Sequence, residues 1–150
     1  MTIMPAKRAI TRDDILPMAE YGRIRMDRRR AIVSKKQNRR LAVGPVATFY
    51  FECWDTMLQQ VHEMLFIERG GEAQIADELS AYNPLIPNGR ELVATVMFEI
   101  DDPDRRKAVL SKLGGVEETM FLEFAGHRVG SVAEADVDRT SASGKASSVQ

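Results

Sequence analysis

Residues 46–87 constrain the fold more than any other stretch, because a strand pattern is followed at once by two helix patterns. Positions 46–51 read VATFYF, which is β-branched or aromatic apart from one alanine and is apolar on both faces. Such a run is typical of a central or doubly covered strand. Apolar residues then recur at helical spacing over 54–65 and, after a Gly-Gly pair, over 75–82. We therefore expect a helical hairpin attached to a buried strand, with Asp55 as the N-cap of its first helix.

The sequence on either side of this stretch predicts further elements. A long, strongly basic helix is expected over 19–38, and a shorter capped helix precedes it. Residues 92–100 alternate as a strand does, and Asp102-Pro103 then begins another helix. Short strands at 120–124 and 129–132 are expected to pair as a β-hairpin.

The resulting element order is ααβααβαββ, in which strands and helices do not alternate regularly. This order predicts the α+β class, with a mixed, mostly antiparallel sheet of about four strands and helices packed against it. A β-α-β crossover over 92–124 would give the sheet a parallel pair. The length of 150 residues suits one domain, which we place at 1–132. The acidic and then Ser-rich residues 133–150 are expected to form a loose polar tail.

The net charge of −1 hides a strong asymmetry along the chain. Residues 1–40 contain twelve Lys/Arg and four Asp/Glu, whereas residues 41–150 contain nine and eighteen. We expect the basic helix to pair with the acidic body, with Arg25 and Arg29 partly buried against acids such as Glu52 or Glu63. The alternative is a basic surface for nucleic acid, an anionic cofactor or an acidic partner. The near-neutral total disfavours a dedicated nucleic-acid binder, which must neutralise many phosphates.

Motifs for metal or cofactor chemistry fail on inspection. His62-Glu63 begins like the zinc motif H-E-x-x-H, but position 66 is Phe. A di-iron site needs Glu-x-x-His, and the residue three before His62 is Gln59. We therefore expect no metal and no cofactor, and we place His62 on a helix surface. The lone Cys53 is flanked by aromatic residues and is expected to be a small core residue.

Polar residues around the helical hairpin form the candidate binding surface, and no catalytic residue can be named. Its loop over 82–87 carries two aliphatic residues between two prolines, which fix the backbone. Such a loop either closes the core or offers its apolar pair to a partner. The residues of the candidate surface are Arg25, Arg29, Glu52, His62, Glu63, Tyr82, Asn83, Leu85, Ile86 and Arg90.

Three segments resemble an uncharacterised bacterial family, a domain of unknown function. They read GRIRMDRRR, FYFECWDTMLQQVHEMLFIE and ADELSAYNPLIPNGRELVATVMFEID, and the resemblance extends over about 10–132. The resemblance implies genes beside a rubrerythrin and an iron–sulfur protein similar to heterodisulfide-reductase subunits, and hence an accessory role in peroxide or redox metabolism under oxidative stress. It also implies that similar proteins continue past residue 150 with a short apolar strand, so that the sheet of this chain would have an unpaired edge.

These observations together predict a non-catalytic, cytoplasmic accessory protein that binds a rubrerythrin-like or iron–sulfur redox partner. Cytoplasmic location is expected because the first residues contain no apolar signal segment and no apolar run is long enough to span a bilayer. Two alternatives remain open. One is a small-ligand-binding protein or enzyme with a polar pocket near the helical hairpin, and the other is nucleic-acid binding through the basic helix.

Overall fold

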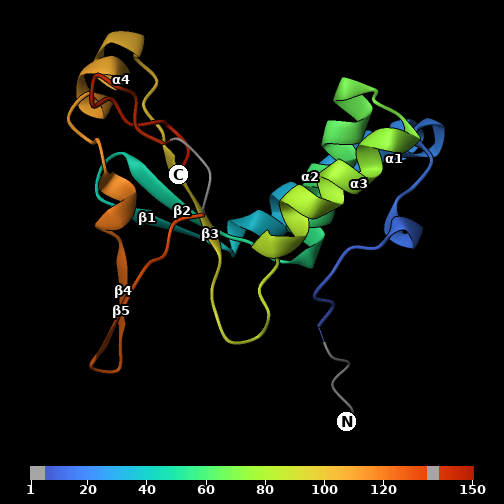
Figure 1. The fold of residues 1–150 in the computed structure, drawn as a ribbon, viewed down its shortest axis with the longest axis horizontal. Coiled ribbons are helices and arrows are strands. Elements are labelled where there is room, and N and C mark those ends of the chain that lie inside the picture. The colour runs from blue at the N-terminus through green and yellow to red at the C-terminus, as the bar shows by residue number, and fades with distance from the viewer. Residues whose placement is uncertain (1–5, 135–138) are drawn as a thin grey trace. The chain divides into compact units, whose positions relative to one another are not determined.

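The computed structural model describes residues 6–134 and 139–150, and the chain divides into two compact units. Unit 1 contains the residues up to Arg40 together with Tyr50–Ala94. Unit 2 contains Leu41–Phe49 together with the residues from Thr95 onward. Helices form most of unit 1, and strands with one longer helix form unit 2 (Figure 1). The fold belongs to the α+β class, as the sequence predicts.

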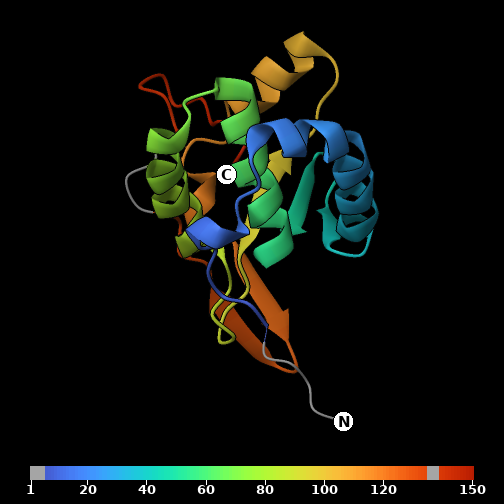
Figure 2. The ribbon, with the colours of Figure 1, turned by 90° about the vertical axis from the view of Figure 1, so that its right-hand side faces the viewer.

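Unit 1 is built on three helices that follow the predicted ranges closely. They are α1 (Met18–Gln37), α2 (Trp54–Glu68) and α3 (Glu72–Tyr82), with short 3-10 helices η1 (Arg12–Asp14) and η2 (Asn83–Leu85). Helix α2 packs against both α1 and α3 (Figure 2). Gly22 lies where α1 approaches α2, and a Cβ at this position would meet the Phe66 ring at 3.1 Å. A glycine inside α1 therefore allows the two helices to pack closely.

Both the N-terminal and the C-terminal end of α2 differ from the sequence-based prediction. Its N-cap is Cys53 and not Asp55, and the backbone N–H of Cys53 donates to Thr56 Oγ1 at 2.9 Å. Asp55 is instead ion-paired with Lys35 of α1. The helix ends at Arg69, whose φ of 55° is in the left-handed region that favours glycine.

The hydrophobic core of unit 1 lies under α2. Its buried members come from the chain before α1, from α2, from α3 and from the loop after α3: Ile10, Ile15, Met57, Leu58, Val61, Leu65, Ile75 and Ile86. Helix α2 contributes half of them, because Leu58, Val61 and Leu65 recur at the helical period that the sequence shows. The predicted stripe on this helix is confirmed.

The strands form two separate sheets instead of one. The first has the order β1-β2-β3, from β1 (Arg40–Val43), β2 (Ala47–Phe51) and β3 (Ala94–Phe98). Strand β2 is central, as predicted, but its residues are half-buried and not fully covered. No strand was predicted where β1 lies; it pairs because Gly44, with φ at 67°, turns the chain back beside β2.

The second sheet is an antiparallel hairpin of β4 (Phe121–Phe124) and β5 (His127–Gly130), which confirms the predicted pairing. Because β3 and β4 lie in different sheets, the expected β-α-β crossover within one sheet is wrong. The segment between them holds α4 (Pro103–Leu110), whose N-cap Asp102 accepts a hydrogen bond from the Arg105 N–H at 3.1 Å. This cap agrees with the prediction.

Residues 139–150 are packed in unit 2, which differs from the loose tail expected from composition. The N–H of Val96 donates to the Gln150 carbonyl at 2.9 Å, and the N–H of Phe98 donates to the Ser148 carbonyl at 2.8 Å. Ala146 is buried in a second core cluster with Phe98 and Leu110. The segment is polar in composition, but its backbone can pair with β3 whatever its side chains are. Residues 148–150 therefore cover one edge of β3, and both the expected unpaired edge of the sheet and the domain boundary at 132 stay predictions.

Candidate functional site

A buried polar cluster joins α1 to α2 in unit 1. The Tyr21 hydroxyl donates to Glu63 Oε1 at 2.8 Å and accepts from Gln59 Nε2 at 2.9 Å. Arg25 donates to the same carboxylate, from Nη2 to Oε2 at 2.8 Å and from Nε to Oε1 at 3.2 Å. Its guanidinium also lies over the Phe66 ring, 4.7 Å from the centroid. The predicted pairing of Arg25 with Glu63 is confirmed.

His62 lies beside this cluster and is fully buried, so its expected place on the helix surface is wrong. Its ring stacks on Tyr21 with centroids 4.8 Å apart and planes inclined by 13°. Its Nε2 accepts from the Leu16 N–H at 3.1 Å, so a neutral ring carries its proton on Nδ1. Among the described residues, this buried Nδ1 has no hydrogen-bond partner. His62 therefore holds the chain before α1 against α2.

The surroundings shift the pKa of each titratable group in the cluster. Burial, followed by the charge of Arg28, lowers the pKa of His62 from 6.5 to about 4. Burial and then the hydrogen bond to Glu63 raise the pKa of Tyr21 to about 12. The hydrogen bond from Arg25 lowers the pKa of the Glu63 carboxyl group. At neutral pH the cluster therefore holds a neutral imidazole, a protonated phenol and an ionised carboxylate.

This arrangement suits structural support better than acid–base catalysis. Three side chains donate to the Glu63 carboxylate, namely Tyr21, Gln59 and Arg25. A carboxylate so occupied has little capacity left to take a proton from a substrate. The cluster instead fixes the orientation of α1 on α2, because a partly buried, hydrogen-bonded charge pair holds its partners in one geometry.

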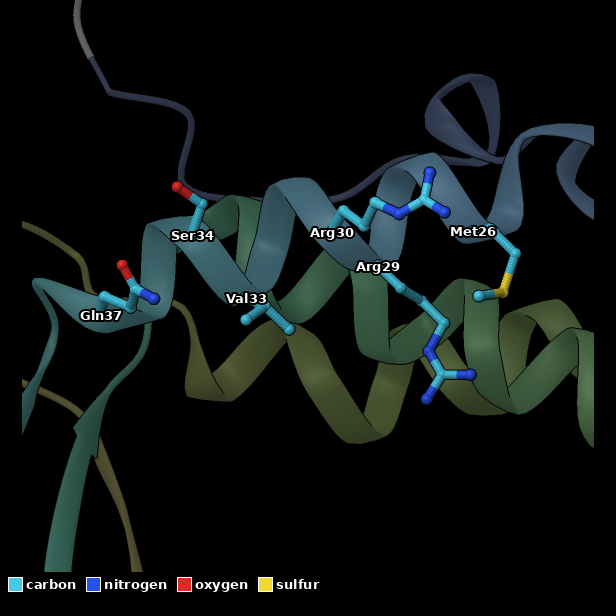
Figure 3. Close-up of a pocket in the computed structure, with 6 residues that line it drawn as sticks. All are labelled: Met26, Arg29, Arg30, Val33, Ser34 and Gln37. Carbon is cyan, nitrogen blue, oxygen red and sulfur yellow. The ribbon is translucent and has the colours of Figure 1, made fainter.

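The outer face of α1 carries Arg29, one of the two exposed members of the candidate surface. Met26 and Val33 lie there with 58% and 60% of their surface exposed. They border a shallow depression of about 450 Å³, and Figure 3 shows that all its lining side chains come from α1 itself. We call this set the α1 outer face, and its residues are Met26, Arg29, Arg30, Val33, Ser34 and Gln37.

Arg29 is exposed on the α1 outer face, so the expectation that it would be partly buried against an acidic residue is wrong. In the described part of the chain Arg29 forms no ion pair, whereas Arg25 pairs with Glu63. Residues one helical turn apart lie near the same side of a helix, but only Arg25 is close enough to α2 to pair with Glu63, while Arg29 lies on the α1 outer face. Arg29 still helps to lower the pKa of Glu63 through its charge.

The loop after α3 closes the core of unit 1. Ile86 is buried in the core, and Leu85 packs against it. The Asn83 side chain accepts from the Ile10 N–H at 2.7 Å and donates to the Ile10 carbonyl at 3.0 Å, which clamps the chain before α1. The Tyr82 hydroxyl accepts from Gln60 Nε2 at 3.4 Å, so it does not reach Glu63. These contacts hold all four residues within unit 1.

Two further members of the predicted surface lie apart from the Tyr21 cluster. Glu52 is buried, and its Oε2 accepts from Thr56 Oγ1 at 2.5 Å. Arg90 is exposed in the loop before β3. Arg39 was not among the predicted residues, yet its guanidinium donates to the carbonyls of Phe51 and Glu52 at 2.9 and 3.0 Å. Arg39 lies between the end of α1 and the start of β1, and no sequence pattern there predicts this contact.

The described residues contain neither a metal-binding cluster nor a membrane-spanning helix. Within 6–134 and 139–150, no group of three or more His, Cys, Asp or Glu side chains could hold a metal ion. No helix in the same ranges is both long and apolar enough to cross a bilayer. The expectation that the protein carries no metal stays a prediction.

The fold and the surface define an α+β protein whose basic first long helix is anchored by a buried polar cluster. The chain belongs to the family described as protein of unknown function (DUF3501), which matches residues 9–150. It is 34% identical, with a TM-score of 0.84, to a solved structure described as a novel protein of unknown function from Burkholderia pseudomallei K96243. The match covers 94% of this chain and 74% of that one. No curated protein matched the chain.

Proposed function

We propose that this protein is a non-catalytic accessory protein that binds an acidic redox protein through the α1 outer face. The observation that carries the proposal is the exposure of Met26 and Val33 in one stripe with Arg29. Exposed apolar side chains bordered by cations are typical of a surface that a partner covers.

The charge of α1 supports an acidic partner. The helix contains seven Lys/Arg and two Asp/Glu residues. Three of the seven are in ion pairs, namely Arg25 with Glu63, Arg30 with Asp27 and Lys35 with Asp55. Pairing within the described residues therefore neutralises only part of the helix, and a partner with carboxylates at matching positions would gain from the rest.

The buried cluster beneath α1 supports recognition by a rigid surface. Tyr21 and Arg25 fix one end of the helix through Glu63, and Lys35 fixes the other end through Asp55. Because the helix is held at both ends, little conformational entropy is lost when a partner covers its outer side. Three side chains already donate hydrogen bonds to the Glu63 carboxylate, so this region suits binding better than acid–base catalysis.

The redox character of the partner is the finer part of the proposal. It is supported by the resemblance in the sequence, which implies a rubrerythrin-like or iron–sulfur protein as the partner. An accessory protein of this kind needs no cofactor of its own, because the partner supplies the redox chemistry. Oxidative stress is the setting in which such a pair would act.

The proposal is tested with purified rubrerythrin and the purified iron–sulfur protein of the same host. We expect one of them to bind wild-type protein with an affinity that falls as salt is raised, because the contact depends on exposed charges. Replacing Arg29→Glu together with Arg30→Glu should weaken binding by about tenfold or more. Isothermal titration calorimetry provides the measurement.

The matched control is Arg105→Glu with Lys107→Glu, which reverses two charges on the short helix α4 of unit 2. This variant should bind the partner as the wild type does. Binding lost equally in both variants would show a general charge effect and contradict the proposed surface. Salt-sensitive binding to duplex DNA or RNA, without binding to either protein, would replace the proposal with nucleic-acid recognition.

A further inference from the structure

The loop that joins η2 to β3 carries an Asn-Gly pair at an exposed position. Residues 86–93 belong to no helix or strand, and Asn88, Gly89 and Arg90 are all exposed (Figure 1). Gly89 has a φ of 95°, which lies in the left-handed region that favours glycine. The turn of this loop therefore depends on Gly89, and the pair is open to water.

An asparagine that precedes a glycine can react with its own backbone. The nitrogen of the glycine attacks the side-chain amide carbon, and water carries the N–H proton to the departing amide nitrogen. The bond from that carbon to the amide nitrogen breaks, ammonia leaves, and a cyclic succinimide remains. Water then opens the ring at either carbonyl carbon, which leaves aspartate or isoaspartate in place of asparagine. Glycine favours the attack because it has no Cβ to obstruct it.

A hydrogen bond within the loop acts on the amide carbon that would be attacked. The Arg90 N–H donates to Asn88 Oδ1 at 3.0 Å. This bond closes an Asx-turn around the Gly89 nitrogen, and so it holds the side chain of Asn88 folded back over the backbone. It also stabilises the negative charge that develops on Oδ1 during the attack.

Arg8 acts on the other reacting group, the Gly89 nitrogen. Its Nη1 donates to the backbone carbonyl of Asn88. Its guanidinium also lies against Gly89, where a Cβ would meet Arg8 Nη2 at 2.5 Å. A cation on this carbonyl draws electrons from the peptide bond between Asn88 and Gly89, and the N–H of that bond becomes easier to deprotonate.

The chain contains two other asparagines, and their surroundings differ from those of Asn88. Asn83 precedes a proline, whose nitrogen has no proton to lose, and its side chain is held by two hydrogen bonds to the backbone of Ile10. Asn38 precedes Arg39, whose N–H already donates to a carbonyl of α1 at 3.0 Å. The structure therefore distinguishes Asn88 from both.

We propose that Asn88 is a self-modification site, at which the native fold promotes loss of ammonia and conversion to aspartate and isoaspartate. Either product adds a negative charge beside Arg8 and Arg90, so the positive charge at this part of the candidate surface decreases. Isoaspartate also routes the backbone through the former side chain, which displaces the carbonyl that Arg8 binds. The contact between this loop and the segment before α1 is then weakened.

The first test incubates the purified full chain in neutral buffer and follows residue 88 by peptide mass spectrometry. Electron-based fragmentation distinguishes isoaspartate from aspartate. We expect both products at Asn88 and much less conversion at Asn38 and Asn83 in the same sample. Gly89→Ala should slow the conversion by about tenfold or more, because its methyl group obstructs the attack. An unmodified Asn88 in the wild type, or equal conversion at all three asparagines, would overturn the proposal.

A second test asks whether the fold promotes the reaction beyond what the Asn-Gly pair does alone. Arg8→Gln removes the cation from the Asn88 carbonyl and should slow the conversion several-fold. Lys7→Gln is the matched control, because Lys7 lies over the Trp54 ring and pairs with Asp14, and it should react as the wild type does.

A comparison without any variant uses the wild-type chain unfolded in urea, where neither hydrogen bond persists. This chain should convert more slowly at Asn88 than the native protein. Equal rates in Arg8→Gln and the wild type, or faster conversion in the unfolded chain, would contradict the role assigned to the fold.

Discussion

His62 is the residue whose chemistry depends most on its surroundings. It is fully buried, stacks on Tyr21 and accepts a hydrogen bond from the Leu16 N–H. A protonated imidazole could not accept that bond, and Arg28 adds repulsion, so the folded state favours the neutral ring. Protonation of His62 therefore opposes folding, and its pKa is lower in the folded chain than in the unfolded chain.

The first residue-scale consequence is a loss of stability in mild acid. The pKa of His62 falls from 6.5 to about 4 on folding, so the unfolded chain binds more protons between these values. The free energy of unfolding should fall as pH drops from about 7 through 5, and His62 accounts for about 2 kcal/mol of that fall. Urea unfolding at several pH values measures this dependence.

The control for this experiment is His62→Gln, whose amide oxygen can still accept from Leu16 but does not titrate. Its stability should change little between pH 7 and 5. Glu63 adds pH dependence only at lower pH, because its pKa is lowered from 4.5. If the wild type and His62→Gln lose stability in parallel, His62 does not titrate as inferred.

At the scale of elements, the loop formed by η2 and the residues after it closes the core of unit 1. Its two prolines stiffen the backbone, and its aliphatic pair lies inward: Ile86 is buried and Leu85 is partly buried. Asn83 adds two hydrogen bonds to the backbone of Ile10. The loop therefore joins two segments that are distant in sequence, and this favours a role as a lid on the core over a partner surface.

This role leads to a prediction for the aliphatic pair. Ile86→Ala should lower the free energy of unfolding by about 2–4 kcal/mol, because it leaves a cavity among well-packed side chains. Leu92→Ala is the matched control, since Leu92 lies in the same connection to β3 and is mostly exposed. The control should change stability by less than about 0.5 kcal/mol. Thermal and urea unfolding provide the comparison, and equal effects at both positions would exclude the lid interpretation.

At the scale of the whole molecule, each compact unit depends on segments from distant parts of the chain. Unit 1 needs the residues before α1, which Asn83 and His62 hold by hydrogen bonds. Unit 2 needs residues 139–150, which pair with β3 and bury Ala146 against Phe98 and Leu110. Because segments distant in sequence complete each unit, the stability of each unit is sensitive to changes near the ends of the described chain.

Removal of residues 139–150 should therefore weaken unit 2 while leaving unit 1 folded. The Val96 and Phe98 amides lose their acceptors on Gln150 and Ser148, so their hydrogen exchange should become much faster. The Met57 amide of α2, which donates to the Cys53 carbonyl, should keep its protection. Hydrogen-exchange mass spectrometry compares the two regions. Unchanged protection across β3 in the shortened chain would contradict the packed conformation of these residues.

Local signals in the sequence were sufficient for the helices and most strands. The apolar period over α2, the Asp102-Pro103 start of α4 and the alternation of β4 and β5 are each set within a few neighbouring residues. An ion pair between the basic helix α1 and an acidic residue elsewhere in the chain could also be predicted, because opposite charges were concentrated in two parts of one chain. These features follow from residue type and spacing, and the sequence by itself determined them together with the α+β class.

The tertiary structure alone decided which side chains are buried and which backbones pair. Helix α1 is polar around most of its surface, so no period marks Arg25 as the inward arginine and Arg29 as the outward one. His62 carries no sign of burial, because its cover comes from Tyr21 and Leu16 more than forty residues earlier. Residues 139–150 pair with β3 through backbone groups that every sequence possesses. Such contacts depend on which distant segments meet, and local sequence patterns do not encode that meeting.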